Sequence, residues 1–380
     1  MNKQEKTVLI ITTHFPPNVG GIESHLTALV STLIEGKWNI FIATYQPLAL
    51  SKFTHSVERQ DNVTIYRFPW LGFNIFHKLA SRPILEFLYL FPGLFLVSLF
   101  VLILHAKDIK VVHAQGLIPT VVAVILGKLF RKRVISSTHN LYFFPQSGLY
   151  PTIAKLTFSK ANSVLVPTNF AKLELKRIGV PEDKIGIFKY WIDLSKFSPI
   201  NKKEARSKTK WSLFTLLFVG RLIETKGVKL LLDFLPYLDK KIQLAIIGTG
   251  PLSEDIKQAE KKYPNLTYIG RIQNQDLPLY YSAADLVVVP SLVDEGFGFV
   301  VMESIACGTP VIASNKGGLS DAVSLKTGRL VKPTSENFRK EIEFLFRNPQ
   351  QINVLKRSCR TYALKNFSKE NVSDIITAYE

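Results

Sequence analysis

DEGFGFVVMESIACGTPVIAS, residues 294–314, joins a loop, an apolar helix pattern and a buried strand pattern. Gly296 and Gly298 punctuate the loop and allow the backbone to approach a ligand closely. The helix pattern ends at Cys307, and the strand pattern covers residues 309–314. This order places the loop at the carboxyl edge of a parallel sheet, where open α/β folds bind their ligands. The stretch therefore predicts an α/β fold with a ligand site at its sheet edge.

Two glutamates, Glu295 in the loop and Glu303 in the helix pattern, stand eight residues apart. The helix, predicted to begin near Phe297, directs N–H groups and the positive end of its dipole towards an anion. Two turns further on, the Glu303 carboxylate is placed to accept hydrogen bonds from sugar hydroxyls. Phosphate at the helix start and hydroxyls beside a carboxylate describe a nucleotide sugar. We therefore expect a glycosyltransferase.

A simpler interpretation takes Glu295 as a loop carboxylate and Glu303 as a solvated helix residue, and most glutamate pairs at this spacing fit it. Here Val300, Val301 and Ile305 surround Glu303 with apolar neighbours. A carboxylate on a buried helix needs hydrogen-bonding partners. The neighbouring sequence therefore favours a ligand site.

Length and charge narrow the class of protein. A chain of 380 residues suggests two domains, and 47% hydrophobic with 21% charged residues excludes a disordered chain. The formal charge of +18 indicates a negatively charged partner, which nucleic acid, anionic lipid or a phosphorylated substrate would supply. Because no nucleic-acid-binding motif accompanies the charge, we expect no nucleic-acid partner.

Cys307 and Cys359 are the only cysteines, and Cys307 lies in the apolar helix pattern. This usage predicts a reducing compartment and no structural disulfide. The N-terminal MNKQEKTVLIITTHFPP does not fit a signal peptide, because its apolar run is short and leads directly into a strand and a turn. We therefore expect a cytoplasmic protein.

Strand patterns alternate with helix patterns, such as Ile22–Leu33 and Pro119–Leu129, along most of the chain. This alternation predicts doubly wound parallel sheets with crossover helices. The first series of strands is Thr7–Thr12, Trp38–Thr44, Val63–Phe68, Ile109–Ala114, Arg133–Thr138 and Ser163–Pro167. The second series is Thr215–Val219, Gln243–Ile247, Leu266–Ile269, Leu286–Val289 and Pro310–Ala313. We expect two Rossmann-like halves with a cleft between them.

The lysine-rich stretch Asp193–Lys210 has little periodicity and is the predicted linker. It separates a first domain, residues 1–192, from a second domain, residues 211–365. The last helix pattern, Lys369–Tyr379, need not belong to the half that precedes it.

Residues 84–104, ILEFLYLFPGLFLVSLFVLIL, are almost wholly apolar and approach the length of a membrane span. Pro92-Gly93 is expected to divide the segment. The uninterrupted piece Leu94–Leu104 would rise only about 16 Å, short of a bilayer core of about 30 Å. We therefore expect a buried crossover helix.

Aromatic and basic side chains around this segment suit a membrane interface better than a core. They are Trp70, Phe73, Phe76, Lys78, Arg82, Phe87, Tyr89 and Phe91. The apolar loop LYFFPQSGLY from Leu141 and the basic run Arg131-Lys132-Arg133 fit the same interpretation. We expect peripheral association with an anionic membrane surface, on its cytoplasmic face.

Three further candidate sites follow predicted strands. In HFPPNVGG, Gly20-Gly21 precedes a helix and allows backbone amides to reach an anion, although a tight turn fits equally well. In GRLIETKG, Arg221 and Lys226 are suited to hold a diphosphate, with surface charges near a turn as the alternative. His139 ends a strand at the edge where ligands bind, although a lone histidine is more often structural.

No Asp-x-Asp pattern occurs in the chain. A metal-dependent diphosphate site normally uses paired carboxylates on Mg²⁺ or Mn²⁺. Fixed cations and a helix dipole would have to stabilise the leaving diphosphate instead. We therefore expect no metal and no cofactor besides the donor substrate, a UDP- or GDP-sugar.

Taken together, eight motifs resemble glycosyltransferase family 4 over nearly the whole chain. They are FPPNVGG, VVHAQG, STHN, VPTNF, GRLIETKG, AIIGTGP, VVVPSLVDEGFGFVVMESIACGTPVIASNKGG and YALKNFS. The resemblance implies the GT-B fold, retention of the anomeric configuration and no metal. It also implies an acceptor-side first domain, a nucleotide-sugar-binding second domain, and a C-terminal helix, residues 366–380, that packs back on the first.

The resemblance also assigns roles to residues of this chain. Glu303 would bind the ribose hydroxyls of the donor, and Glu295 its sugar and diphosphate. The other donor-binding residues would be Gly20, Gly21, Arg221, Lys226, Gly296, Phe297, Gly298 and Phe299. His139 would contact the sugar. Glu295, His139, Arg221 and Lys226 are the candidate catalytic residues.

Two positions depart from the family pattern. Tyr190-Trp191 stands where an Asn-Gly pair usually precedes the linker, so we expect a different turn and a tryptophan packed on the cleft. Asp321 replaces a frequent glutamate, a change expected to matter little.

The acceptor follows from the surface. Aromatic and basic residues favour a lipid-linked acceptor in cell-envelope polysaccharide or glycolipid synthesis, and a soluble glycan remains open. Two rival functions also remain. A non-hydrolysing sugar-nucleotide epimerase would share the architecture but need no acceptor. A non-catalytic membrane-associated GT-B protein is disfavoured by the intact Glu295, Glu303, Arg221 and Lys226.

Overall fold

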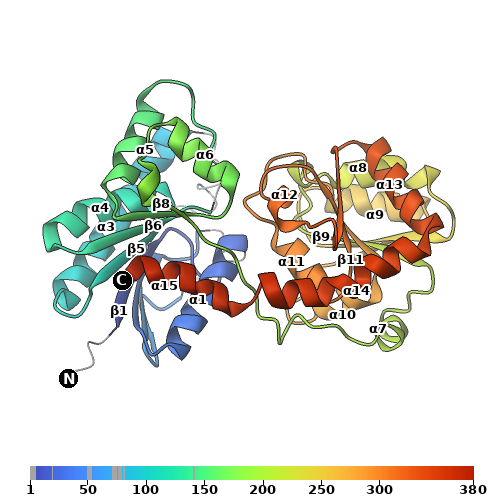
Figure 1. Ribbon diagram of the computed structural model, residues 1–380, viewed down its shortest axis with the longest axis horizontal. Coiled ribbons are helices and arrows are strands. Elements are labelled where there is room, and N and C mark those ends of the chain that lie inside the picture. Colours follow the sequence, from blue (N-terminus) through green and yellow to red (C-terminus); the bar gives the residue numbers. More distant parts are fainter. Residues whose placement is uncertain are drawn as a thin grey trace. The chain divides into compact units, whose positions relative to one another are not determined.

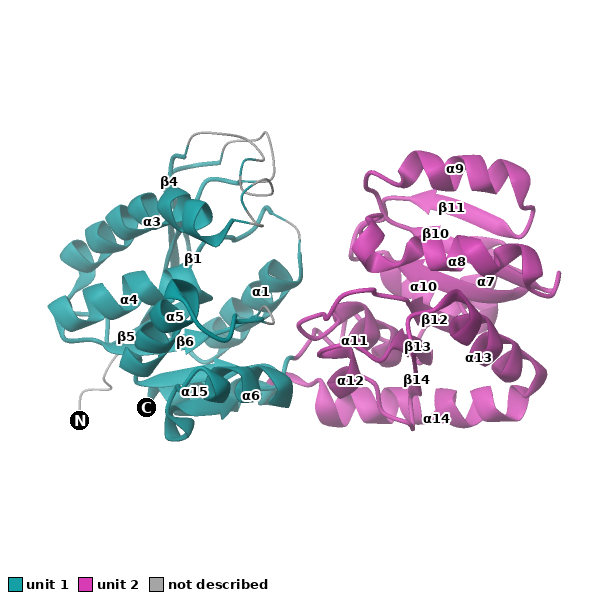
Figure 2. Cartoon of the chain, turned by 90° about the horizontal axis from the view of Figure 1, so that it is seen from above, with its two compact units in different colours: residues 1–190, 370–380 teal, residues 191–369 magenta. Residues whose placement is uncertain are grey.

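The structure is a computed structural model that describes residues 6–18, 20–48, 54–70, 75, 79, 82–139 and 142–380. The chain divides into two compact units (Figure 2). Unit 1 comprises residues 1–190 and 370–380, and unit 2 comprises residues 191–369. Each unit has helices on both faces of one sheet (Figure 1).

Unit 1 is built on an eight-stranded sheet in the order β3-β4-β2-β1-β5-β6-β7-β8. Its described strands pair in parallel, except that β3 is antiparallel to β4. The strands are β1 (Thr7–Thr12), β2 (Asn39–Tyr45), β3 (Val57–Gln60), β4 (Val63–Phe68), β5 (Val111–Gln115), β6 (Arg133–Ser137), β7 (Ser163–Val166) and β8 (Ile185–Ile187). The strands predicted in this half are confirmed to within about two residues. The sequence does not predict β3 and β8, because both are short edge strands without a buried pattern.

Helices cover both faces of this sheet. Val112 and Ala114 of β5 belong to the core beneath α3 and α4, whereas His113 between them hydrogen-bonds Tyr379 of α15. Because alternate strand residues point to opposite faces, α3 and α4 lie on one face and α15 on the other. The helices are α1 (Gly21–Glu35), α3 (Pro83–His105), α4 (Leu117–Phe130), α5 (Leu149–Lys160), α6 (Asn169–Arg177) and α15 (Ser373–Tyr379), with short 3-10 turns at Glu182–Lys184 and Lys369–Val372. Both predicted helices lie within α1 and α4.

Helix α3 corrects the expectation that Pro92-Gly93 divides the apolar segment, because it runs unbroken through Pro92. The Tyr45 hydroxyl of β2 enters the helix at this point. It donates a hydrogen bond to the Leu90 carbonyl and accepts one from the Leu94 amide at 2.7 Å. The hydroxyl therefore occupies the place of the helical bond between Leu94 and Leu90 and fastens α3 to the sheet.

Among the described residues, α3 is the one helix with the length and hydropathy of a membrane span. Its inner face, with Leu94 and Val101, is buried in the core of unit 1, as expected of a crossover helix between β4 and β5. Some aromatic side chains predicted at a membrane interface pack against this core instead: Trp70, Tyr89 and Phe91. Others lie outside the described residues: Phe73, Phe76 and Lys78. The outer face of α3 is exposed.

Unit 2 is built on a six-stranded parallel sheet in the order β11-β10-β9-β12-β13-β14. The strands are β9 (Phe214–Val219), β10 (Ile242–Ile247), β11 (Leu266–Gly270), β12 (Leu286–Val289), β13 (Val311–Ser314) and β14 (Gly328–Val331). All but β14 are predicted, to within about one residue. The helices are α7 (Lys202–Thr209), α8 (Val228–Phe234), α9 (Ser253–Lys262), α10 (Leu277–Ala283), α11 (Phe299–Ala306), α12 (Leu319–Ala322), α13 (Ser335–Arg347) and α14 (Pro349–Asn366), with short 3-10 turns at Glu224–Lys226 and Leu235–Tyr237.

The predicted linker, residues 193–210, is not a linker, because it is a folded part of unit 2. Its C-terminal half forms α7, where Asn201 accepts hydrogen bonds from the first turn. Lys202 and Arg206 each form a 2.5 Å ion pair with the largely buried Asp285. Only Ala205 of this helix is buried, so the charged residues hide its periodicity.

Candidate active site

The topology of unit 2 sets the position of the candidate site. Strand β9 lies between β10 and β12, so the chain moves to one side of β9 and later returns to the other. Loops at such a switch point separate beyond the carboxyl ends of the strands and leave a ligand site. The loop after β9, residues 220–227, carries Arg221 and Lys226. The loop after β12, residues 290–298, carries Glu295.

These two loops are joined to each other. The Leu292 amide donates to the Thr225 carbonyl at 2.9 Å, and the Lys226 ammonium lies 2.7 Å from a Glu295 carboxylate oxygen. Gly227 adopts a positive φ of 70°, and an added Cβ there would lie 1.9 Å from the Pro290 carbonyl oxygen. The close approach therefore requires glycine.

The loop after β13 supports Glu295 from the other side. The Gly318 amide donates to the Glu295 carbonyl at 2.7 Å. A Cβ on Gly318 would lie 2.0 Å from the Gly296 carbonyl oxygen. The Ser291 hydroxyl also contacts the Glu295 carboxylate. Backbone and side chain of Glu295 are therefore both fixed by neighbouring loops.

Helix α11 begins at Phe299, two residues later than predicted. Gly298 precedes it with a positive φ of 85° and supplies no side-chain cap. An oxygen of an anionic ligand can take the place of that cap, because the amides of the first turn and the helix dipole favour negative charge. The residues Gly296, Phe297, Gly298 and Phe299 thus form the turn into this helix.

Glu303 is buried, with 7% of its surface exposed, which agrees with the apolar neighbours seen in the sequence. The Tyr281 hydroxyl donates to its carboxylate at 2.7 Å. Burial raises the pKa of Glu303 to about 7, although Tyr281, Lys196 and Asn274 each favour the ionised form. The carboxylate is therefore held where a small change of environment decides its charge.

Arg221 is exposed, beside the buried Leu222. Within the part of the chain that the structure describes, its guanidinium forms no ion pair. Five N–H donors are thus presented to solvent at the start of the loop, in a geometry that matches phosphate oxygens.

The remaining predicted residues belong to unit 1. Gly20 precedes α1, and Gly21 is the first residue of that helix. The Glu23 carboxylate lies against Gly20, since a Cβ there would be 2.5 Å from its Oε2. An anion at this helix start would have to displace Glu23.

His139 is 6% exposed and belongs to a buried polar cluster. Its Nδ1 lies 2.7 Å from the Tyr190 hydroxyl, and its Nε2 lies 2.6 Å from Gln115 Oε1. Burial lowers the pKa of His139 to about 3. The imidazole is therefore neutral, and a sugar contact requires the exchange of one of these hydrogen bonds. Trp191, expected on the cleft, is buried at 2% exposure in unit 2.

Family models match both halves of the chain. The model described as Glycosyltransferase Family 4 covers residues 19–196, and the model described as Glycosyl transferases group 1 covers residues 200–365. The chain is a glycosyltransferase of family 4. Its fold is GT-B, and it is an enzyme.

Known proteins are similar to this glycosyltransferase over almost its full length. A GDP-mannose-dependent alpha-(1-6)-phosphatidylinositol monomannoside mannosyltransferase of Mycolicibacterium smegmatis is 24% identical, covering 95% of this chain and 94% of that protein. The solved structure of sucrose-phosphate synthase from Thermosynechococcus elongatus superposes with a TM-score of 0.81 at 22% identity, covering 98% of both chains. Anabaena HepE in complex with UDP-glucose gives a TM-score of 0.75 at 16% identity, again covering 98% of both chains.

Three residues around Glu303 in this glycosyltransferase were missed by sequence reasoning. Tyr281 comes from α10, Asn274 from the loop after β11, and Lys196 from the stretch taken as a linker. Lys196 contacts the Asn274 side chain. No local motif marks them, because they meet only through the packing of separate segments.

Among the residues that the structure describes, no group of three or more His, Cys, Asp or Glu side chains is arranged to hold a metal ion. The Lys226–Glu295 ion pair joins the loop after β9 to the loop that leads into α11.

Proposed function

We propose that this glycosyltransferase moves a sugar from a UDP- or GDP-sugar to a hydroxyl of a lipid-linked acceptor, with retention at the anomeric carbon and without a metal ion. The observation that carries the proposal is the fixed group of Lys226, Glu295 and the α11 helix start, with buried Glu303 about one turn along the same helix. One sheet edge thereby combines positive charge that can bind a diphosphate with a carboxylate that can accept hydrogen bonds from hydroxyls.

The donor would be held from its two ends. Its ribose hydroxyls donate to the Glu303 carboxylate and compete there with the Tyr281 hydroxyl. Its phosphates accept from Arg221, Lys226 and the amides at the start of α11. HepE, solved with UDP-glucose, and the mannosyltransferase, named for GDP-mannose, support a nucleotide-sugar donor. The base itself stays a choice between uracil and guanine.

Transfer requires stabilisation of the departing diphosphate. As the bond from the anomeric carbon to the phosphate oxygen breaks, negative charge grows on the nucleoside diphosphate. Two cations stand at that position: Lys226, which its ion pair fixes, and Arg221, which is exposed. Preorganised charge of this kind lowers the activation barrier of transfer without a metal. The acceptor hydroxyl oxygen forms the new bond on the same face, and its proton passes to the leaving phosphate oxygen. This route retains the configuration and needs no protein nucleophile.

A lipid-linked acceptor is supported by the surface of unit 1. Large apolar side chains are exposed along one face of it, including Leu88 at 60% and Ile103 at 63%. The mannosyltransferase relative is named for a phosphatidylinositol acceptor. We infer peripheral association with the cytoplasmic face of a membrane, and a role in cell-envelope polysaccharide or glycolipid synthesis.

The test is transfer of labelled sugar from a panel of UDP- and GDP-sugars into a lipid extract of the source cells, with EDTA present. One donor is expected to label the lipid phase, and the anomeric configuration of the product should match that of the donor. Conversion of the sugar nucleotide without any acceptor would indicate an epimerase instead. Nucleotide binding without turnover on lipid or soluble acceptors would indicate a non-catalytic protein.

A further inference from the structure

Helices α3, α4 and α5 lie side by side on one face of the unit 1 sheet (Figure 1). Their outward side chains form an apolar face: Ile84, Leu85, Leu88, Leu96, Phe100, Ile103, Leu104, Ile125, Leu129, Leu149, Ile153 and Leu156. Leu129 and Leu149 are 67% and 65% exposed. This many exposed apolar side chains on three neighbouring helices indicates an interaction site.

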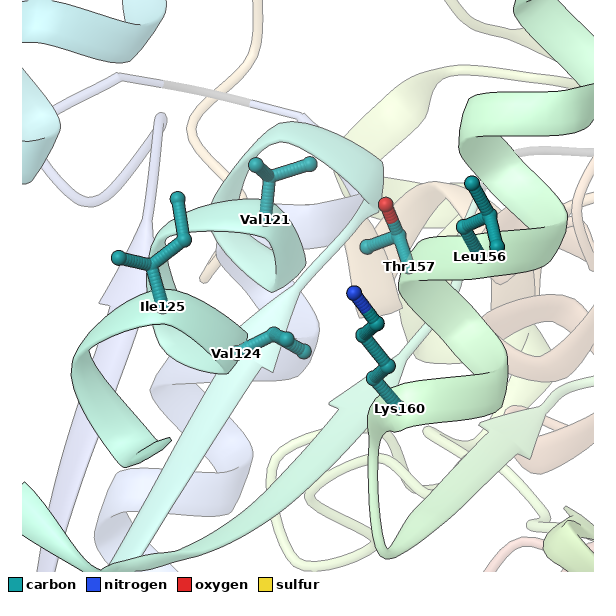
Figure 3. A pocket seen from close by; sticks show the side chains of 6 residues that line it. All are labelled: Val121, Val124, Ile125, Leu156, Thr157 and Lys160. Atoms are coloured by element: carbon teal, nitrogen blue, oxygen red, sulfur yellow. The ribbon is translucent and has the colours of Figure 1, made fainter. Parts of the chain in front are cut away.

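A groove between α4 and α5 divides this face. Val121 and Ile125 of α4 and Leu156 of α5 line it (Figure 3). It continues towards the C-terminal ends of both helices as a hollow of about 600 Å³. The continuation is lined by four cationic residues, Lys128, Arg131, Lys132 and Lys160. The groove is therefore apolar at one end and basic at the other.

Three of the four cations at the basic end have no ion-pair partner among the described residues, whereas Lys132 lies within the electrostatic influence of Asp108 and Lys110. Lys128, Arg131 and Lys160 are exposed and form no ion pair with any residue that the structure describes. The Lys132 ammonium donates to the Ala106 carbonyl. The C-terminal ends of α4 and α5 contribute roughly half a negative charge each, so about three positive charges remain. The groove thus lacks an anion.

We propose that the α4–α5 groove binds one anionic phospholipid of a bilayer. Its phosphate accepts from Lys128, Arg131 and Lys160, and its acyl chains lie along Val121, Ile125 and Leu156. Both parts of the lipid have a matching surface in the groove. The basic side chains attract the anionic headgroup, and the apolar face enters the membrane interface with the acyl chains. The inference deepens the proposed membrane association and rests on it, but not on the donor chemistry.

The groove is separate from the candidate active edge. Helix α4 begins after Gln115, at the carboxyl end of β5, and ends before Arg133, at the amino end of β6. With 14 residues it is about 21 Å long. The basic end is therefore about one helix length from the carboxyl edge of the sheet, where α/β folds bind substrates. The lipid bound here is an anchor, distinct from the acceptor.

The test compares vesicle binding by the full chain in phosphatidylcholine alone and in phosphatidylcholine with phosphatidylglycerol, at low salt. The groove variant is Lys128→Ala/Arg131→Ala/Lys160→Ala. The charge-matched control is Lys208→Ala/Lys257→Ala/Lys340→Ala, whose three lysines are exposed in unit 2. We expect the groove variant to lose roughly 100-fold in binding to anionic vesicles, and the control to lose less than about threefold. Equal losses of vesicle affinity in the two variants would overturn the proposed site, because the net charge of the protein alone would then explain binding.

A second variant fills the apolar end without changing the charge. Ile125→Trp/Leu156→Trp should weaken binding of short-chain phosphatidylglycerol in solution at least tenfold, with the circular dichroism spectrum retained. Wild-type affinity in this variant would overturn the proposal. So would a concentration-dependent dimer that the same change abolishes, since the face would then serve a second copy of the chain.

Transfer to a water-soluble acceptor separates the two proposals. Groove variants should keep that activity while they lose vesicle binding. If wild-type protein transfers to no acceptor yet binds anionic vesicles through the groove, the proposed function fails and the lipid site stands.

Discussion

The Lys226 ammonium lies 2.7 Å from the Glu295 carboxylate and links the loop after β9 to the loop after β12. Both side chains are partly buried, at 27% and 14% exposure, so solvent screens the pair less than an ordinary surface ion pair. Arg221 on the same loop is exposed to solvent. One cation is thus held in place before the donor arrives, and the other is positioned by the donor itself.

Lys226→Ala and Arg221→Ala should each lower kcat/KM for transfer by about 10²- to 10³-fold, because each removes a positive charge that stabilises the leaving diphosphate. Arg221→Ala should leave the thermal midpoint unchanged, since that side chain is exposed. Initial rates at several donor concentrations give both parameters.

The matched control for these substitutions is Lys229→Ala. Lys229 is the second residue of α8, two residues beyond the loop; it is 51% exposed and pairs with Glu224. It should transfer sugar at the wild-type rate. If Arg221→Ala were equally active, Arg221 would have no part in the donor site.

Glu303→Gln should abolish donor binding above pH 7 and also change the pH dependence of stability. The pKa of Glu303 is raised from 4.5 to about 7 by burial, so the folded protein holds a proton that the unfolded chain has released. The stabilisation is complete below pH 4.5 and is lost as pH rises to 7, by up to roughly 3 kcal/mol. The glutamine variant should lack this loss and be more stable than wild type at pH 8.

Urea unfolding of wild type and Glu303→Gln at pH 5 and pH 8 measures how Glu303 changes the free energy of unfolding with pH. Equal pH dependence in the two proteins would contradict the buried, proton-holding carboxylate. Donor affinity of wild type, followed over the same range, should rise through pH 7, because the ionised form accepts from both ribose hydroxyls.

Local pattern predicts most of the fold. Strand β12 is buried along its whole length, and its apolar run LVVV predicts its bounds without error. The pattern does not predict α7, because this helix is charged and lacks apolar periodicity. It is held instead by the ion pairs of Lys202 and Arg206 with Asp285. A helix with one buried residue has no apolar stripe that a sequence pattern could reveal.

The residues of the candidate site also differ in how far local sequence predicts them. Arg221, Lys226 and Glu295 lie on loops with glycine at forced close approaches, and such glycines are visible in a sequence. His139 lies at a strand end as predicted, yet both of its nitrogens are taken by Tyr190 and Gln115. These partners are distant in sequence, so the burial of an end-of-strand histidine follows only from the fold.

Tyr45→Phe should destabilise unit 1 by about 1–3 kcal/mol, because the Leu90 carbonyl and the Leu94 amide both lose their partner inside a buried helix. The ring itself stays, so the loss reports the hydroxyl alone. Tyr237→Phe is the control, since Tyr237 is 72% exposed. Guanidinium unfolding followed by circular dichroism measures the difference. A loss no larger than that of the control would show that α3 closes its own hydrogen bonds at Pro92.

Acid should loosen unit 1 before unit 2. Burial lowers the pKa of His113 and of His139 to about 3, so below pH 6.5 the unfolded chain binds protons that the folded unit does not. At pH 5 the two histidines together cost unit 1 roughly 4 kcal/mol. The raised pKa of Glu86 opposes this in part. Unit 2 moves the other way over this range, because Glu303 gains its proton.

Hydrogen exchange of the full chain at pH 5 and pH 7.5, corrected for the intrinsic pH dependence of exchange, measures the two units separately. Protection of β5 and β6 should fall at pH 5, while that of β12 and β13 should hold or rise. His139→Gln should reduce the acid loss in unit 1, because glutamine bonds without titrating, whereas His55→Gln at an exposed position should not. Parallel changes in both units would show that the buried histidines do not set the acid sensitivity.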